Sequence, residues 1–317
     1  MKNSYYNLRI SLSDICQHKC PYCLPKKDHF LENNYYFIYE KIAKILSCIN
    51  IKKIRFTGWE PLMNKNFFLI VNNIKKYFYD VELALTTNAQ NLINNIENIV
   101  KLKINKINIH IDTLDNKKYN FYCKGNLFNI FKCINQLKNL NLHLKINCVV
   151  QKNFNDDELL DFLYFSKEYN LEVRFIELIN TGISRNYLLK SFVSSEEILK
   201  ILSKYSKIKL IGRKNSHEPS LKYNFSFLNV DFGVISSSSL PFCLECNRIR
   251  ISYDLFLKNC LYEKNGLELK ELIYLNNFKK VKEKLFFFIN NKKNFNPKNL
   301  NLEFKGHNSF SMSEIGG

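Results

Sequence analysis

The feature that most restricts the fold is a regular alternation of short apolar segments with longer amphipathic ones over the first 180 residues. In the segment 143–150, Leu144, Ile146, Cys148 and Val150 fall on one face, as they do in a strand. We predict six strands, at 8–12, 52–56, 81–85, 105–111, 143–150 and 171–176, with helices at about 36–49, 65–77, 92–101, 127–140 and 156–168. Strands joined through helices form right-handed crossovers and a parallel sheet, so we expect a partial (βα)6 barrel of the TIM type.

The residues that carry chemistry follow the predicted strands. In barrels of this kind the active site lies at the C-terminal ends of the strands. The loop 16–23, the turn 57–61, the segment 86–88 and Asp112 each come directly after a strand. The alternation stops near residue 180, and the segments beyond it are shorter and more polar. We therefore predict a barrel domain at 1–180 and a smaller C-terminal region at 181–317.

The first cysteine group, Cys16-x3-Cys20-x2-Cys23, lies directly after the first strand. Three thiolates so closely spaced can hold three irons of a cubane iron–sulfur cluster and leave the fourth iron open for another ligand. The alternative is zinc, but a structural zinc site normally has four protein ligands, and the nearest spare one is His18, inside the loop itself. Tyr22, next to the last cysteine, is equally suited to packing on an adenine ring and to packing in the core.

A second group consists of Cys243, Cys246 and Cys260, again without a fourth ligand. Arg248 and Arg250 lie between these cysteines, and on an extended segment their side chains would point to the same side. We predict a second open cluster with an anion site beside it; a structural metal in the C-terminal region is the alternative. The remaining cysteines are expected to be small apolar fillers: Cys48, Cys123, Cys133 and Cys148.

Composition excludes some classes of protein and weakens another. No apolar run approaches the roughly 18 residues of a membrane span, and no secretory signal is evident, so we expect a cytoplasmic protein whose cysteines bind metal. The formal charge is +18, but only seven of the 47 basic residues are Arg. Lysine supplies charge in a composition dominated by Asn, Ile and Lys, whereas arginine also supplies a planar fork for carboxylate or phosphate. The arginines, more than the net charge, therefore indicate an anion site.

The motifs together resemble one known family. Cys-x3-Cys-x2-Cys after a first strand resembles the radical S-adenosylmethionine enzymes, and the surrounding sequence is similar to the GTP 3′,8-cyclases of molybdenum cofactor biosynthesis. The likeness spans nearly the whole chain and includes 9–16, 23–25, 55–62, 85–88, 174–177, the second cysteine group and the final Gly316-Gly317. It implies two [4Fe–4S] clusters and S-adenosylmethionine as cofactors, GTP as substrate and an external one-electron donor. It implies neither nucleic acid nor a membrane as a partner, and a homodimer is left open.

The resemblance also implies a role for each matching residue. Cluster ligands would be Cys16, Cys20, Cys23, Cys243, Cys246 and Cys260. Contacts to S-adenosylmethionine would come from Tyr22, Trp59, His110 and Ile179. Contacts to GTP would come from Arg9, Arg55, Thr86, Lys145, Arg248, Ile249 and Arg250. Catalytic roles are implied for Arg174, which would shape the site, and for Gly316 and Gly317, which would enter it.

Five positions depart from the family pattern. Trp59 stands where the family has a second glycine, so an indole needs room there and a glycine-specific backbone angle would be lost. His110 replaces a serine, Ile179 a methionine, and Ala89 and Leu255 each a glycine. We expect an active but compromised enzyme.

Two other functions remain as alternatives. The chain could be a radical enzyme that acts on a peptide or another small molecule, since related enzymes also carry C-terminal clusters. From a different class, it could be a zinc-bound, basic nucleic-acid-binding protein without catalysis, as the charge of +18 and Cys243-x2-Cys246 would suggest.

Overall fold

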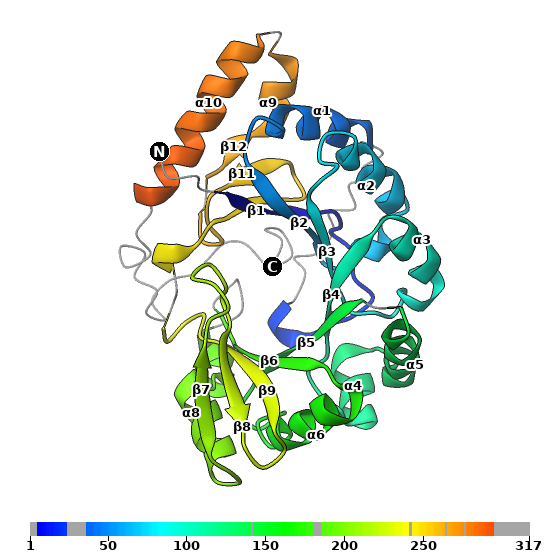
Figure 1. Cartoon of the computed structure of the whole chain (residues 1–317), viewed down its shortest axis with the longest axis vertical. Helices are drawn as coiled ribbons and strands as arrows, with labels where there is room; N and C mark the ends of the chain where they lie inside the picture. Colours follow the sequence, from blue (N-terminus) through cyan, green and yellow to red (C-terminus); the bar gives the residue numbers. More distant parts are fainter. Residues whose placement is uncertain are drawn as a thin grey trace.

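The computed structural model describes residues 5–23, 36–140, 142–179, 185–240, 243–263, 265–275 and 277–294. Six parallel strands form an open barrel wall (Figure 1). They are β1 (Tyr6–Ser11), β2 (Ile51–Thr57), β3 (Glu82–Thr87), β4 (Ile104–His110), β5 (His143–Val150) and β6 (Glu172–Glu177). Each pairs in parallel with the next, so their C-terminal ends share one edge. The predicted partial barrel is confirmed.

Helices cover the outer face of the wall (Figure 1). They are α1 (Tyr36–Leu46), α2 (Phe67–Lys75), α3 (Ile96–Lys101), α5 (Leu127–Lys138) and α6 (Leu159–Tyr169), with short 3-10 turns η1 (Pro21–Cys23), η2 (Pro61–Met63) and η3 (Ile93–Asn95). Alternate strand residues such as Ile10, Phe56 and Ile107 are buried against the helices. Phe56 of β2 meets Phe67 of α2 edge to face, at 5.7 Å between ring centres. The other strand face lines the barrel interior.

Two details differ from the sequence-based prediction. Helix α4 (Asn116–Cys123) was not predicted, although Asp115 caps it by accepting from the backbone N–H groups of Lys117 and Lys118. Helix α6 begins at Leu159 rather than near residue 156. The side chain of Asn155 holds the preceding turn: its amide donates to the carbonyls of Asp112 (2.5 Å) and Val149 (2.9 Å). These bonds keep the turn at the end of β5 and delay the helix.

The C-terminal residues extend the same sheet at both edges. β9 (Val230–Ile235) pairs in parallel with β6, and β10 (Arg248–Ile251) pairs in parallel with β1. Antiparallel strands continue outward: β8 (Leu221–Phe225) and β7 (Ile208–Gly212) beyond β9, and β11 (Phe256–Lys258) and β12 (Leu267–Glu268) beyond β10. The result is one sheet of twelve strands. The end of the strand–helix alternation near residue 180 predicted a smaller appended region. That pattern is local, so it could not show that strands from this region pair with the first sheet.

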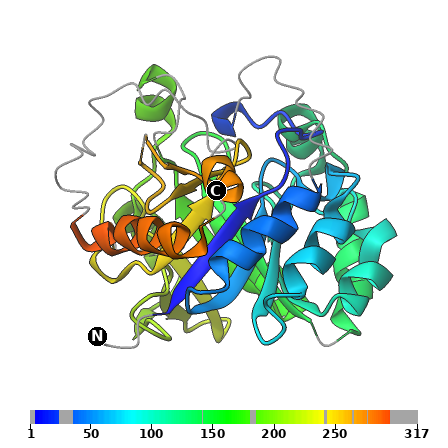
Figure 2. The same ribbon diagram turned by 90° about the horizontal axis from the view of Figure 1, so that it is seen from above.

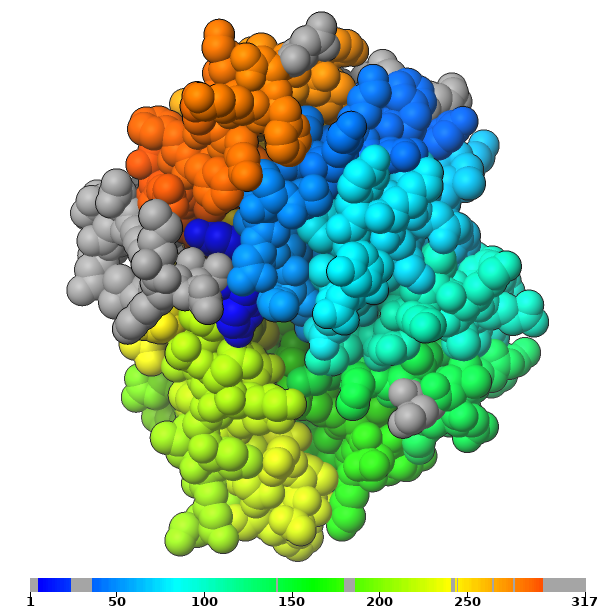
Figure 3. All heavy atoms as spheres, turned by 45° about the horizontal axis from the view of Figure 1, so that its top comes forward, coloured from blue at the N-terminus to red at the C-terminus, as the bar shows by residue number. Residues whose placement is uncertain are grey.

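Four further helices belong to the C-terminal half: α7 (Arg185–Ser191), α8 (Ser195–Ser203), α9 (Leu269–Tyr274) and α10 (Phe278–Asn290). Two 3-10 turns, η4 (Cys243–Glu245) and η5 (Asn291–Asn294), complete the described elements. The orange surface of α9 and α10 lies beside the blue surface of α1 (Figure 3). Helix α10 packs through Val281, Leu285 and Ile289. Among the described helices, none has the length and apolar character needed to cross a bilayer.

A glycine at position 103 should stabilise the fold. Lys103 is exposed, follows α3, and adopts a left-handed φ of 58°. Because glycine takes this conformation without the Cβ penalty, Lys103→Gly is expected to raise the free energy of unfolding by about 1 kcal/mol. The matched control is Lys101→Gly, at the exposed last residue of α3, where the same change should cost up to about 1 kcal/mol. Chemical denaturation of the two variants measures both changes in the free energy of unfolding. Changes of the same sign and size in the two variants would contradict the prediction.

Candidate functional site

The first cysteine group lies in the loop after β1, at the C-terminal edge of the barrel, and ends in η1 (Figure 2). Two backbone bonds attach this loop to the turn after β2: Trp59 N–H donates to Ser13 O (3.1 Å) and Glu60 N–H to Ile15 O (3.0 Å). Parallel pairing of β1 with β2 brings the loop and the turn together. The predicted placement of the cysteines beside the 57–61 turn is therefore seen directly.

The three thiols of this group are close enough to perturb one another. Burial, and then the neighbouring thiols among other groups, raises the pKa of Cys16 and of Cys23 to about 12. The Cys16 sulfur accepts from the backbone N–H of His18 (3.3 Å) and from the side-chain amide of Asn88 (3.4 Å). Burial lowers the pKa of His18 to about 4, so this imidazole is neutral at pH 7. Soft, largely buried sulfur donors of this kind fit an iron–sulfur cluster, whose binding would release their protons.

The turn after β2 needs glycine at position 58, not at position 59. Gly58 has a φ of +126°, and a Cβ there would lie 2.7 Å from Ser13 O. Trp59 is not among the described residues with positive φ. The expectation that Trp59 loses a glycine-specific angle is therefore wrong, because that angle belongs to Gly58. Ala89 (φ 63°) and Leu255 (φ 71°), the other replacements of glycine, do adopt left-handed backbone.

Glu60 joins the ends of β2 and β3. Its buried carboxylate accepts from Thr87 Oγ1 (2.8 Å), Asn88 N (2.7 Å) and Leu62 N (3.1 Å). Burial raises the pKa of Glu60 to about 7, although these hydrogen bonds oppose the rise. The backbone of Asn88, whose side chain donates to Cys16, is thus held by the carboxylate that follows β2.

Glu60→Gln should flatten the pH dependence of stability. A carboxyl with a raised folded-state pKa contributes stability below its unfolded pKa near 4.5 and loses it as pH rises toward 7. We expect the melting temperature of the wild type to fall as pH rises across this window. Glu60 should account for a loss of at most about 3 kcal/mol in the free energy of unfolding, and Glu60→Gln should lack this loss. Glu97→Gln, at an exposed helical position, serves as control. Parallel wild-type and Glu60→Gln profiles in thermal scans would count against the prediction.

Tyr22, His110 and Asp112 form a compact triangle at the ends of β1 and β4. The Tyr22 hydroxyl donates to Asp112 Oδ2 (2.6 Å) and contacts His110 Nε2 (2.5 Å), which lies 3.0 Å from the same carboxylate oxygen. Burial alone would lower the pKa of His110, but Asp112 raises it above its ordinary value. Tyr22 therefore attaches the cysteine loop to the end of β4 through its hydroxyl. The sequence had left open whether its ring packs on a ligand or in the core.

An arginine row crosses three adjacent strands inside the barrel. We use this name for Arg250 of β10, Arg9 of β1 and Arg55 of β2, which lie in register. Arg55 donates to Leu85 O (2.7 Å) and Thr86 Oγ1 (3.2 Å). Burial first, and neighbouring arginines second, lower the pKa of Arg55 to about 9 and that of Arg250 to about 10. Within the described ranges no carboxylate forms an ion pair with Arg9 or Arg55, so the row is suited to an anionic ligand.

A second set of charged side chains lies across the barrel, and its cations already form ion pairs with carboxylates. The Glu172 carboxylate contacts Lys145 (2.9 Å), Arg174 (2.7 Å) and Lys222 (2.7 Å). Glu218 lies 3.4 Å from Arg174 and 4.0 Å from Lys145. Arg174 thus forms ion pairs with two carboxylates of the protein.

Gly233 makes room beside this charge network, a role that no pattern in the sequence indicates. It lies opposite Arg174 on β9. A Cβ on Gly233 would lie 2.1 Å from Ser220 Oγ and 3.1 Å from Arg174 Cγ. A larger residue would therefore displace the Ser220 hydroxyl and crowd the side chain of Arg174.

The second cysteine group flanks β10 and lies next to the arginine row. Burial raises the pKa of Cys243 to about 11. Burial also acts on Cys246, but Arg248 and Lys292 outweigh it and lower its pKa. The Lys292 ammonium is 4.0 Å from the Cys246 sulfur and donates to Asn259 O. Nothing in the sequence distinguishes Lys292 from the many other lysines, and it lies 32 residues beyond Cys260.

The other predicted residues are placed as follows. Ile249 is fully buried between Arg248 and Arg250 and faces the core side of β10, in register with Leu8. Ile179 is half-buried just beyond β6. Gly316 and Gly317 lie outside the described residues. Cys133 and Cys148 are buried, as expected for apolar fillers. Cys123 is buried too, but its sulfur also contacts a predicted cluster ligand, because it lies 3.8 Å from the Cys20 sulfur.

Sequence reasoning also missed Glu177, the last residue of β6. Its buried carboxylate accepts from the backbone N–H groups of Ser195 (2.7 Å), Ser238 (2.8 Å) and Ser239 (2.9 Å). These bonds fix the serine-rich stretch to the barrel edge. The only available signal was a glutamate at a strand end, followed much later by clustered serines.

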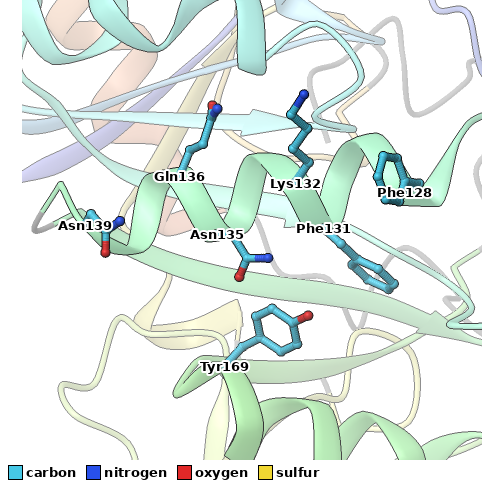
Figure 4. Close-up of a pocket in the computed structure, with 7 residues that line it drawn as sticks. All are labelled: Phe128, Phe131, Lys132, Asn135, Gln136, Asn139 and Tyr169. Atoms are coloured by element: carbon cyan, nitrogen blue, oxygen red, sulfur yellow. The ribbon is translucent and has the colours of Figure 1, made fainter.

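A groove of about 550 Å³ lies on the outer surface (Figure 4). Phe128 and Phe131 of α5 and Tyr169 of α6 line it. It lies on the helical layer, away from the barrel interior and its cysteines, and belongs to no candidate site.

Comparisons with known proteins agree with this geometry. The model of the radical SAM superfamily matches residues 10–165, and that of Molybdenum Cofactor Synthesis C matches 171–296. A GTP 3′,8-cyclase of Clostridium botulinum is 35% identical over 273 residues, 84% of each chain. One of Campylobacter jejuni is 34% identical over 293 residues, 90% of this chain and 89% of that protein. Streptococcus suis SuiB bound to S-adenosylmethionine shares the fold, with a TM-score of 0.66 at 12% identity, over 95% of this chain and 71% of that one.

Proposed function

The chain belongs to the GTP 3′,8-cyclases, radical S-adenosylmethionine enzymes of the first step of molybdenum cofactor biosynthesis, and we propose that each of its two cysteine groups holds a [4Fe–4S] cluster. The substrate we propose is GTP, converted to 3′,8-cyclo-7,8-dihydro-GTP. The observation that carries this assignment is the arginine row beside the second cysteine group, inside a barrel whose edge bears the first.

Cys16, Cys20 and Cys23 would hold the first cluster. Their mutual proximity, and the hydrogen bonds that Cys16 receives from His18 and Asn88, support this ligand set. When bound and reduced, this cluster supplies the electron that cleaves S-adenosylmethionine, which in turn supplies the radical for hydrogen abstraction. The protein positions the reactants and excludes water from them.

Tyr22, Trp59, His110 and Ile179 are the residues that we propose to contact S-adenosylmethionine. The first three lie in or beside the cysteine loop, and Ile179 follows β6 at the same barrel edge. Because His110 is bonded to Asp112 and Tyr22, we propose that it acts mainly by holding the loop. A serine could not span that contact.

GTP would bind across the arginine row. The fixed forks of Arg9, Arg55 and Arg250 suit triphosphate oxygens, and Thr86 would act through its contact with Arg55. Arg248, two residues from Arg250, adds charge beside Cys246. Ile249 could contribute only its backbone, because its side chain faces the core.

The second cluster would use Cys243, Cys246 and Cys260, and its open iron would meet the guanine. Cys246 is close enough to act electrostatically on Arg9, which supports one continuous site for the base and the phosphates. Lys145 and Arg174 would complete the phosphate side from their ion pairs with Glu172. Gly316 and Gly317 are proposed to enter the site from the end of the chain.

Anaerobic reconstitution tests the proposal. We expect about eight irons per chain, GTP-dependent formation of 5′-deoxyadenosine, and the cyclised nucleotide as product. Cys243→Ser should leave about four irons and cleave S-adenosylmethionine without cyclising GTP. Binding of GTP should change the electron paramagnetic resonance signal of the second cluster. A peptide-modifying enzyme of the same superfamily would show no such change, and absence of both products would reject the cyclase.

The proposal includes an external one-electron donor and the reducing cytoplasm as the compartment. It also includes a division of the chain near residue 180. The oligomeric state, with a homodimer still open, is measurable by light scattering on the same sample. The alternative of a non-catalytic zinc protein is set aside, because the relatives that establish the family are enzymes.

A further inference from the structure

Three side chains of the kinds that bind metals meet beside the first cysteine group, and one of them, Cys20, belongs to that group. His18 and Cys20 come from the first loop, and Cys123 is the last residue of α4. All three are buried, and one ligand atom from each lies within 4.8 Å of the others. The two sulfurs are 3.8 Å apart.

The surrounding chain holds this arrangement in place. Lys19 N–H donates to Cys123 O (3.1 Å), which fastens the loop to the end of α4. The His18 ring meets Tyr119 edge to face at 5.6 Å between ring centres. Position 125 must be glycine, because a Cβ on Gly125 would lie 2.4 Å from His18 Nε2.

His18 Nε2 gives an independent sign of a missing partner. The residue is only 6% exposed, and within the described part of the chain this nitrogen has no hydrogen-bond partner. A buried polar atom without a partner is destabilising, so such atoms are rare unless a ligand or water completes them. One ring nitrogen of the same imidazole lies within 4.8 Å of the sulfurs of Cys20 and Cys123.

We propose that His18, Cys20 and Cys123 form a mononuclear Zn²⁺ site in the chain before the first cluster is assembled. One imidazole and two thiolates are the ligands that zinc prefers, with water as the fourth. Two sulfurs at about 2.3 Å from a tetrahedral zinc lie about 3.8 Å from each other, and the sulfurs of Cys20 and Cys123 are 3.8 Å apart. Both thiols would release their protons on binding.

This site would exclude the first cluster, because both need the Cys20 sulfur. That consequence rests on the proposed function, in which Cys20 is a cluster ligand. Zinc binding at His18, Cys20 and Cys123 is therefore inferred to delay cluster assembly, whereas a completed cluster would prevent zinc binding. Cys123 has no other assigned role in the reaction.

Cobalt(II) is the probe for the site, since it takes tetrahedral sites and its thiolate bands are visible. The full-length chain, stripped of clusters and reduced, is titrated anaerobically with Co²⁺. Cys123→Ser should weaken binding at one site more than about tenfold and, because only the Cys20 thiolate remains there, lower the thiolate-to-cobalt absorption of that site by about half. The matched control is Cys133→Ser, a buried cysteine of α5, which should change neither. The second cysteine group is the same in the wild type, Cys123→Ser and Cys133→Ser. Any Co²⁺ that it binds therefore cancels when the titrations are compared.

Gly125→Ala tests the imidazole without changing a ligand. Its methyl group should displace His18, weaken Co²⁺ binding and shift the ligand-field bands. Preloading the stripped wild type with Zn²⁺ should slow iron uptake at the first group, and Cys123→Ser should remove that delay while still assembling the cluster.

Equal Co²⁺ stoichiometry, affinity and spectra for the wild type and Cys123→Ser would overturn the site. Tight Co²⁺ binding at this site in the cluster-loaded wild type would overturn the exclusion. If no variant assembled a cluster at the first group, the proposed function would fail, while the Co²⁺ comparison would still decide the zinc site.

Discussion

Arg9→Met is expected to weaken GTP binding by about 10- to 100-fold and, in the same protein, to raise the stability of the substrate-free chain. A charge-assisted hydrogen bond contributes about 1.5–3 kcal/mol, which sets the loss of affinity. The gain in stability has a separate cause. Burial lowers the pKa of Arg9 well below its ordinary value, and Arg250, Arg248 and Arg55 lower it further. An apolar side chain of similar length relieves both penalties.

The opposite signs are the diagnostic part of this prediction. Calorimetric titration with GTP gives the affinity, and thermal scans without nucleotide should show a rise of a few degrees. Arg213→Met, at an exposed position of the C-terminal half, is the matched arginine control and should change neither quantity appreciably. A lower melting temperature together with unchanged GTP affinity would show that Arg9 is structural and that the arginine row does not bind the nucleotide.

Glu172→Gln is expected to have the largest effect on stability, a loss of about 3–5 kcal/mol. The carboxylate of Glu172, 14% exposed, is shared by Lys145, Arg174 and Lys222. The amide keeps the shape of the side chain but leaves three largely buried cations without their shared anion. Chemical denaturation measures the loss directly.

The matched control for this change is Glu82→Gln. Glu82 pairs with Lys53 (2.6 Å) and also with Lys106, but its side chain is 35% exposed, so solvent screens the charges. We expect a cost of about 1 kcal/mol or less there. Equal losses for the two variants would mean that burial does not set the strength of the Glu172 network.

The pH dependence provides a second readout for Glu172. Burial alone would raise its pKa, but Arg174, Lys222 and Lys145 outweigh burial and hold it near 2. A lowered folded-state pKa contributes stability that is present above the unfolded pKa near 4.5 and lost as pH falls toward 2. The wild type should therefore lose stability more steeply than Glu172→Gln across this acid window. Identical slopes would contradict the assignment.

The strands and the first cysteine group could be predicted because their signals are local. The alternation in 143–150 and the spacing Cys16-x3-Cys20-x2-Cys23 need no knowledge of distant residues. The predicted Arg248–Arg250 pair on an extended segment is likewise found on β10. Helix α4 was missed because it is short, its first turn is polar and its apolar residues are weakly patterned, so only the Asp115 cap marks its start.

The partners of the site residues could not be predicted, because parallel register decides them. Arg9 lies between Arg250 and Arg55 only because β10, from the far end of the chain, pairs with β1. The same applies to Arg174 and Gly233, which face each other through the pairing of β6 with β9. The contact of Cys123 with Cys20 requires α4, which the sequence pattern did not indicate.

By itself the sequence determined the fold class, the two cysteine groups and the family resemblance, since each of these is a property of spacing along the chain. Only the tertiary structure decided that the C-terminal strands complete the first sheet and that Cys123 lies against Cys20. It also decided that Lys145 and Arg174 form ion pairs with Glu172, whereas Arg9 forms none with any residue that the structure describes. The physical reason is that burial and charge pairing depend on contacts between residues far apart in the chain. Such contacts exist only once the parallel sheet has set which strands are neighbours.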